Sequence, residues 1–513
     1  MLYLFASCIA LLIGPLFYRY FSSGSGLQKG LDGFIFVSLG GLVLVHILPE
    51  LLHHGGFLSL LFVVLGLWGP TASERLFHRY SEITHNLTLA LGIGGLLLHT
   101  LTDGGAMVLA QQEGNSPLLA LGVILHRLPV GLAIWWLLKP QVGTKWASLV
   151  IVAMMVLTSV GYFASAQLLS QLSIDNTVYL QAFVTGSILH VVLHQPHGQH
   201  DPDRQGKFEY QAGIGSLLGI GLLALLLLLD SGGHHHHSGH EHSIDQLLSW
   251  TTQVAPALLL AYMLAATRFS FGLTPTTDKL PLLWLQRLAG PEALLVTLLL
   301  LGPEFMLAQL LGLLVIGACL TLFKVQPTDP HPTGKQNALQ FGFSQLVDRS
   351  APWVVLSLVL ANLIGHPSVP LDHPLMQVLI LMLVFLPTRF CNLGGVVLAV
   401  SLAWSGWSDS AVMLALLAAP ILNWSQLKLM SLKQSAVLVV IVCGLLLIAH
   451  QIFLVKESLI AFPESLQWLA LALLALIFGA SLMRLGPRKF LRRLMITKPL
   501  VHGHQHGHDH HHH

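Results

Sequence analysis

Long apolar runs, separated by short polar connections, recur along the whole chain. A run of about 20 apolar residues is long enough for an α-helix to cross the hydrocarbon core of a bilayer. Helices satisfy every backbone hydrogen bond within the segment, so runs of this length favour spanning helices over a β-barrel. We therefore predict an all-α, polytopic integral membrane protein. Residues 1–230 divide into eight apolar segments, at 1–20, 32–52, 57–73, 86–110, 117–138, 146–166, 180–195 and 212–229.

The composition supports the same class. Hydrophobic residues make up 54% of the chain and charged residues only 9%, whereas soluble domains carry about 25% charged residues. The first apolar segment lacks the basic start and the small-residue cleavage site of a secretory signal, so we expect it to remain as a span. The four cysteines all lie in apolar stretches, which implies no disulfide framework.

Lysine and arginine alternate along the connections of the first eight segments. They occur in the first, third, fifth and seventh connections and are absent from the second, fourth and sixth, at Arg19, Lys29, Arg75, Arg79, Lys139, Lys145, Arg204 and Lys207. By the positive-inside rule the odd connections are cytoplasmic, so both ends of this block lie outside. The basic residues that follow Arg484 place the C-terminus in the cytoplasm.

A second hydrophobic block contains an internal repeat. QVAPALLLAYMLA (253–265) is similar to RSAPWVVLSLVLA (349–361), and EALLVTLLLLGPEF (292–305) is similar to SAVMLALLAAPILN (410–423). In each pair a proline opens or interrupts a helix at the matching place, as in transporters that build a site at the bilayer midplane. The chance similarity of leucine-rich sequences is the alternative. The predicted domains are an eight-helix domain at 1–230, a His-rich linker at 231–243, a permease-like domain at 244–484 and a basic, His-rich tail at 485–513.

Histidine is unusually frequent, with 29 residues against 25 lysines and arginines. The linker SGGHHHHSGHEHS (231–243) has a composition that cannot form a core and that can bind metal loosely. A flexible hydrophilic connector is the other interpretation. The tail VHGHQHGHDHHHH (501–513) is interrupted by other residues, which favours a native metal-binding tail over a tag remnant.

Three ionisable residues lie within apolar segments. His99 and Asp103 are four residues apart, so they share one face of a helix, and His126 lies in the next segment. Ionisable residues at membrane depth usually face the bundle interior and mark an ion or substrate path. An imidazole and a carboxylate suit a divalent ion such as Zn²⁺ or Fe²⁺. Interior polar residues that hydrogen-bond neighbouring helices are the alternative. Gly104 and Gly105 would let another helix or a substrate approach closely.

Two further pairs have the same spacing. His46 and Glu50 lie four residues apart at the end of the second segment, and His190 and His194 lie four apart in the seventh. Each pair can bind a metal on one helix face, as a feeding site for the interior group. A position among headgroups and water at a helix end explains them equally well.

Residues 1–230 resemble the ZIP family of metal-ion transporters. The resemblance rests on HILPE (46–50), HTLTDGGA (99–106), HRLPVGLAI (126–134) and GSILHVVLH (186–194), with eight segments and both ends outside. It implies uptake of a divalent cation, with ligands from the fourth and fifth helices, where His99, Asp103 and His126 match. Family members usually carry an acid in the fifth-helix motif, where this chain has Arg127 and Val130. The departure removes an anionic ligand and adds a cation beside the site.

Residues 244–484 more faintly resemble a predicted-permease family, one branch of which exports organoarsenicals. The resemblance rests on the repeated AP motif and on PTRFCNLGG (387–395). That family commonly has paired cysteines in a Cys-x-Cys-Gly setting, whereas this chain keeps only Cys391. A lone buried cysteine more often packs as a small hydrophobic residue than it binds a metalloid.

The sequence therefore predicts transport of a divalent transition-metal cation (zinc first, then iron or manganese) by alternating access. The alternatives are export of a small metalloid or organic solute through the second domain and a non-transporting metal sensor. No nucleophile–base pair, phosphate loop or CxxC motif is present, so we expect no enzyme and no organic cofactor. We expect membrane lipid and the metal substrate as partners, allow for a homodimer, and expect no nucleic acid. The predicted location is a bacterial-type inner membrane.

Overall fold

The computed structural model describes most of the chain, with gaps at several connections. The described residues are 1–20, 26–76, 117–164, 209–231, 238–272, 280–288, 290–325, 337–364, 373–388, 390–451, 459–492 and 494, with short stretches between 93 and 108 and between 178 and 189. Within these residues every regular element is a helix and no strand occurs, which confirms the all-α prediction.

Five helices among the described residues are long and apolar enough to cross a membrane. They are Val142–Phe163, Gln246–Ser270, Pro303–Leu322, Leu432–Ala449 and Glu464–Leu491. No more than half of the most apolar window of any of them is buried within the protein. Large exposed apolar surfaces are rare on soluble monomers, so these helices are compatible with insertion into a bilayer.

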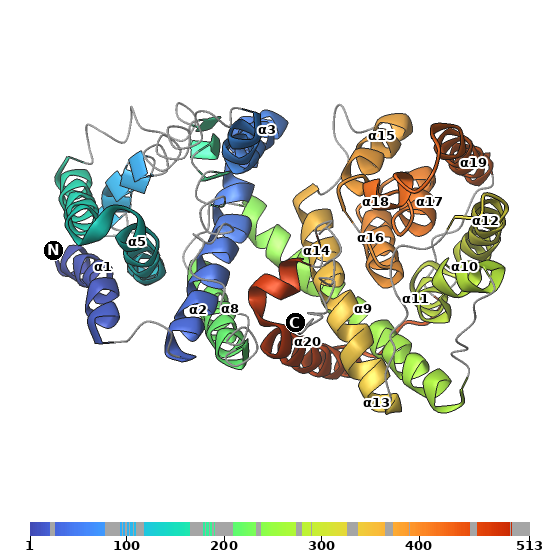
Figure 1. The fold of residues 1–513 in the computed structure, drawn as a ribbon. Helices are drawn as coiled ribbons and strands as arrows, with labels where there is room; N and C mark the ends of the chain where they lie inside the picture. The colour runs from blue at the N-terminus through green and yellow to red at the C-terminus, as the bar shows by residue number, and fades with distance from the viewer. Residues whose placement is uncertain are drawn as a thin grey trace, which may run out of the picture. The chain divides into compact units, whose positions relative to one another are not determined.

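The contacts within the chain divide it into two compact units, coloured by residue number in Figure 1. Unit 1 comprises Met1–Gln246 and Gly479–Arg488, and unit 2 comprises Leu247–Phe478 and Lys489–His513. Each unit is described by itself below.

Unit 1 consists of long helices, several of which are broken at a glycine. Its described elements are α1 (Leu2–Tyr20), α2 (Gly26–Leu42), the π-helical turn η1 (Val43–Ile47), α3 (Leu48–Leu76), α5 (Pro117–Phe163) and α8 (Glu209–Ser231). The residues described between 93 and 108 are also helical. Gly56 interrupts α3 and Gly143 interrupts α5, each with a positive φ that glycine adopts without strain.

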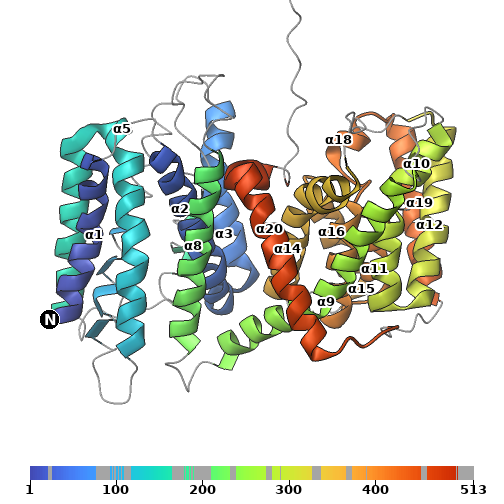
Figure 2. The ribbon, with the colours of Figure 1, turned by 90° about the horizontal axis from the view of Figure 1, so that it is seen from below.

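The two halves of α5 pack side by side. A hydrogen bond joins Arg127 of the first half to Thr158 of the second, and these residues are nearly equidistant in sequence from Gly143. The halves therefore run antiparallel, with Gly143 at the turn. In Figure 2 they stand beside α1, with which α5 makes its most extensive contact.

Glycines bring the helices of unit 1 into backbone contact. A Cβ on Gly33 of α2 would collide with the carbonyl oxygen of Ala212, in α8, and a Cβ on Gly215 would collide with that of Gly30. Association of helices in a bilayer depends on such close packing, because lipid tails are as apolar as the side chains they replace. Gly40, also in α2, has no neighbouring atom within 4 Å, so only part of the helix is constrained.

An ion pair fixes the C-terminal part of α20 (Glu464–Arg492) within unit 1. The Arg488 guanidinium donates to both carboxylate oxygens of Asp32, at 2.8 and 3.1 Å, and lies over the ring of Phe36. α20 is broken at Gly486, and the residues after this break, up to Arg492, form a short helical segment at the start of the predicted C-terminal tail.

The described part of unit 2 contains more helices, several of which have fewer than 14 residues. They are α9 (Ser238–Ser270), α10 (Leu280–Leu288), α11 (Pro291–Leu301), α12 (Pro303–Leu322), α13 (Ala338–Gln340), the π-helical η4 (Phe341–Leu346), α14 (Val347–Ile364), α15 (Pro374–Phe385), α16 (Asn392–Trp404), α17 (Asp409–Ala418), α18 (Trp424–Leu427) and α19 (Leu432–Gln451). The last residues of the predicted His-rich linker thus belong to the start of α9.

The helices α16 and α17 form the centre of unit 2. Eleven of the 13 residues of α16 and nine of the ten residues of α17 are buried. They pack against each other and against α14, α15 and α19 (Figure 1). At 1.5 Å per residue these helices are about 15–20 Å long, well short of a bilayer core of about 30 Å. Gly406, with φ of 79°, lies in the turn between them.

The prolines of the predicted repeat lie at matching places in the two helices of each pair. Pro256 lies inside α9 and Pro352 lies inside α14. In the second pair, α11 ends just before Pro303 and α17 ends two residues before Pro420. Proline lacks the amide hydrogen that a continuous helix needs, which fits the helix ends in the second pair; in the first pair the helices continue through the proline.

Candidate functional site

Asp103 is the predicted intramembrane residue whose side chain the structure describes. It is buried, with 7% of its surface exposed. His99 lies outside the described residues. His126 lies in α5, but its side chain is outside the description. The local geometry of the site therefore rests on Asp103 and the residues around it.

The Asp103 carboxylate is paired with Arg127. Arg127 Nη2 lies 3.0 Å from Asp103 Oδ2, and Arg127 is one of the largest fully buried side chains, only 1% exposed. The same nitrogen donates to the carbonyl oxygen of Thr100 at 3.3 Å, and Nη1 donates to Thr158 Oγ1 at 2.6 Å. The sequence placed a cation beside the site, and the structure shows that this cation binds the candidate ligand directly.

Close helix packing explains why these groups meet. A Cβ on Gly104 would collide with the carbonyl oxygen of Thr158, and a Cβ on Gly161 would collide with that of Leu101. The helical residues around Asp103 thus pack directly on the second half of α5. The close approach predicted for Gly104 is confirmed, and it brings Thr158 within reach of Arg127.

The pairing has a clear electrostatic reason. An ionised carboxylate or guanidinium buried alone costs several kcal/mol, whereas a paired and hydrogen-bonded couple offsets much of that cost. Oxygen ligands of this type suit divalent cations. A cation that reaches Asp103 must therefore replace, or share, the bond that Arg127 makes.

The other predicted ligands are located only in part. His46 lies on the π-helical turn η1 and Glu50 lies in α3, but the structure does not describe their side chains. His190 and His194 lie outside the described residues. Among the described residues no group of three or more His, Cys, Asp or Glu side chains is close enough to hold a metal ion. The π-helical turn was not predicted, and such single turns occur often at functional sites.

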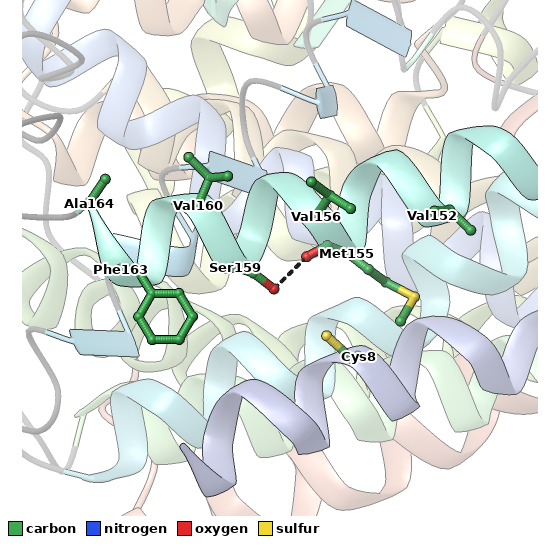
Figure 3. A pocket seen from close by; sticks show the side chains of 8 residues that line it. All are labelled: Cys8, Val152, Met155, Val156, Ser159, Val160, Phe163 and Ala164. Atoms are coloured by element: carbon green, nitrogen blue, oxygen red, sulfur yellow. Dashed lines mark hydrogen bonds between the residues drawn. The ribbon is translucent and has the colours of Figure 1, made fainter.

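An open groove of about 660 Å³ runs between α1 and the second half of α5 (Figure 3). Its lining is almost entirely apolar, from Val152 to Ala164, with Cys8 contributed by α1. The Ser159 hydroxyl is satisfied by the carbonyl oxygen of Met155 at 2.9 Å. The groove therefore offers little to hold an ion.

Two neutral hydrogen bonds between buried side chains join helices within unit 2. Thr297 Oγ1 donates to Gln309 Oε1 at 2.7 Å, and Tyr262 and Ser350 share a bond of 2.8 Å. Cys391 caps α16, because its sulfur accepts from the backbone amide of Gly394. This role fits a small structural cysteine better than a metalloid ligand.

No protein-family model matches the chain, and neither a curated protein nor a solved structure matches it. The function therefore has to be inferred from the arrangement of the residues.

Proposed function

We propose that unit 1 transports a divalent transition-metal cation across a membrane and that Asp103 is a ligand in its path. The observation that supports this most is a buried carboxylate, on a helix packed inside a membrane-compatible unit, paired with the guanidinium of Arg127. His99, one turn before Asp103, and His126, beside Arg127, complete the proposed ligand set.

The helix content of unit 1 supports a ZIP-like architecture. Each of the eight predicted apolar segments contains described helical residues. The location that goes with this proposal is a bacterial-type inner membrane with a cytoplasmic C-terminus.

The ion pair suggests how the carrier, without a bound cation, avoids exposing an unpaired carboxylate to the bilayer. Moving one elementary charge through a potential of 100 mV changes the free energy by about 2.3 kcal/mol, and an unpaired carboxylate in a bilayer costs more still. With Arg127 bound to Asp103 the empty site is neutral. Alternating access then exposes Asp103 to one side, where a cation enters, and afterwards to the other.

The test is zinc flux into proteoliposomes that contain the full-length protein and a zinc-sensitive dye. We expect Asp103→Asn to abolish flux, because the amide is a poor ligand for the cation. Asp32→Asn is the matched control, since Asp32 is also a buried, arginine-paired carboxylate of unit 1. It should retain flux. Equal flux in Asp103→Asn and in the wild type would refute the proposal.

A second measurement separates the interior site from the histidine-rich segments. The histidines within 231–243 and 501–513 are replaced by glutamine, and the zinc content of the purified full-length protein is measured. We expect stoichiometric zinc to remain. Loss of all bound zinc, together with absent flux, would favour the non-transporting metal sensor.

Unit 2 supports a second candidate function, export of a small metalloid or organic solute. The observation is that the short helices α11 and α17 each end two residues before a proline, an arrangement typical of transporter sites with interrupted helices. Cells that express Asp103→Asn retain an intact unit 2. Resistance to organoarsenicals that persists in these cells would assign export to unit 2.

A further inference from the structure

Two buried polar atoms near the ion pair have no hydrogen-bond partner in the described part of the chain. They are Arg127 Nε and the hydroxyl oxygen of Ser7, which lies in α1 and is fully buried. Buried polar groups in proteins are nearly always hydrogen-bonded, so an unpartnered pair requires an explanation.

The packing of α1 on α5 places Ser7 and Arg127 at the same height along the two helix axes. The N-terminal amine of Met1 bonds the Tyr162 hydroxyl, so α1 starts beside the end of α5 and runs antiparallel to its second half. It therefore runs parallel to the first half. A Cβ on Gly131 of that half would lie 2.6 Å from the Leu11 carbonyl oxygen. Ser7 and Arg127 lie one turn before Leu11 and Gly131, so they occupy matching positions.

We infer that Arg127 is a tethered cation that competes with the transported ion for Asp103 and that Ser7 receives its guanidinium when the ion binds. This inference rests on the proposed function of Asp103 as a cation ligand. In the structure Arg127 bonds Asp103, Thr100 and Thr158, and the Ser7 hydroxyl has no partner among the described residues.

Charge repulsion drives the exchange. A divalent cation at Asp103 would lie within a few ångströms of the guanidinium, and like charges at that range repel strongly in a buried site. Arginine does not lose its proton in proteins, so it cannot relieve this repulsion by becoming neutral. It has to withdraw. The Ser7 hydroxyl is the acceptor already placed at its level.

The competition predicts the direction in which each substitution changes the KM for zinc. Without the positive charge the cation binds Asp103 unopposed, so Arg127→Gln should lower the KM for zinc by about tenfold or more, within the usual range of coupling between ligands. Arg127→Lys keeps a tethered positive charge and should stay near the wild-type KM. Ser7→Ala removes the receiving hydroxyl, which has no partner in the empty state, and should raise KM while kcat changes little.

Thermal unfolding of the full-length protein gives a second readout that does not require flux. Arg127→Gln leaves Asp103 without its counter-charge and should unfold at a lower temperature. Zinc should restore this loss, because the ion takes the place of the guanidinium. Zinc should not raise the unfolding temperature of Arg127→Gln/Asp103→Asn, because this variant has no carboxylate at position 103 to bind the ion. Arg488→Gln is the control for loss of an arginine from the second ion pair described in unit 1.

The outcomes are distinguishable. If Arg127→Gln leaves the KM for zinc unchanged, or if zinc does not restore the stability that this variant loses, Arg127 has only a structural role and the inference is wrong. Zinc flux in the wild type would still support the proposed function in that case. An unchanged KM in Ser7→Ala overturns the role of Ser7. Absence of zinc flux in the wild type overturns the proposed function and, with it, the competition.

Discussion

The two units solve the same problem, polar groups inside an apolar protein, in different ways. Unit 1 buries a full charge pair, Arg127–Asp103, whose side chains are 1% and 9% exposed. The buried polar residues described in unit 2 are neutral, such as Thr297 with Gln309, and its ion pair Arg268–Glu292 is partly exposed, like Arg488–Asp32 of unit 1. A charge pair can exchange one partner for an ion, whereas a neutral bond between two side chains offers no such exchange. The difference favours unit 1 as the place for a cation.

The largest expected effect is the loss of one member of the buried ion pair. Arg127→Ala should destabilise unit 1 by about 3–5 kcal/mol, because Asp103 is left as an uncompensated charge. Arg127→Ala/Asp103→Ala should cost less than the single change. Unfolding of the purified protein in mixed detergent measures both. A double variant less stable than Arg127→Ala would mean that charge is not the cause.

A steric change in unit 1 should have the next largest effect. Gly33→Val places branched carbons against the backbone of α8, and we expect a loss of about 1–3 kcal/mol, as for overpacked cores. Gly40→Val carries the same substitution in the same helix at an open position and serves as the control. The same unfolding measurement applies. Similar losses in both variants would indicate a general helix effect instead of contact with α8.

A capping change in unit 2 should cost less. The Ser408 side chain accepts a hydrogen bond from the Ala411 amide at the start of α17. Ser408→Ala should therefore destabilise the protein by about 1 kcal/mol. Ser408→Asp keeps an acceptor at this position and should retain most of the stability. If alanine and aspartate are equivalent, the cap does not stabilise α17.

The smallest effect is expected for the neutral pair. A double-variant cycle of Thr297→Val and Gln309→Leu should give a coupling of about 0.6 kcal/mol, the average for interhelical hydrogen bonds in a membrane protein. The same cycle at Arg127 and Asp103 should give several times more. Equal couplings in the two units would remove the contrast between them.

The sequence predicted the class of fold and part of the site, for identifiable reasons. Long apolar runs are sufficient to predict helices, and the spacing of His99 and Asp103 together with Gly104 predicted a polar group at a close helix contact. Spacing along the chain does not reveal a partner 24 residues away, so the bond from Arg127 to Asp103 required the structure. The π-helical turn at Val43–Ile47 also has no sequence signal, because it depends on how neighbouring helices accommodate one extra residue.

The shortness of α16 and α17 has a consequence for membrane insertion. A segment of 10 to 13 residues is too short to cross a bilayer alone, so we expect the pair to enter from one face and to return to it after the turn at Gly406. The hairpin therefore adds no crossing, and the chain before α16 and after α17 stays on the same side. A topology drawn by counting apolar segments would count two crossings too many here. Reporter tags in the connections on either side of the hairpin should give the same orientation.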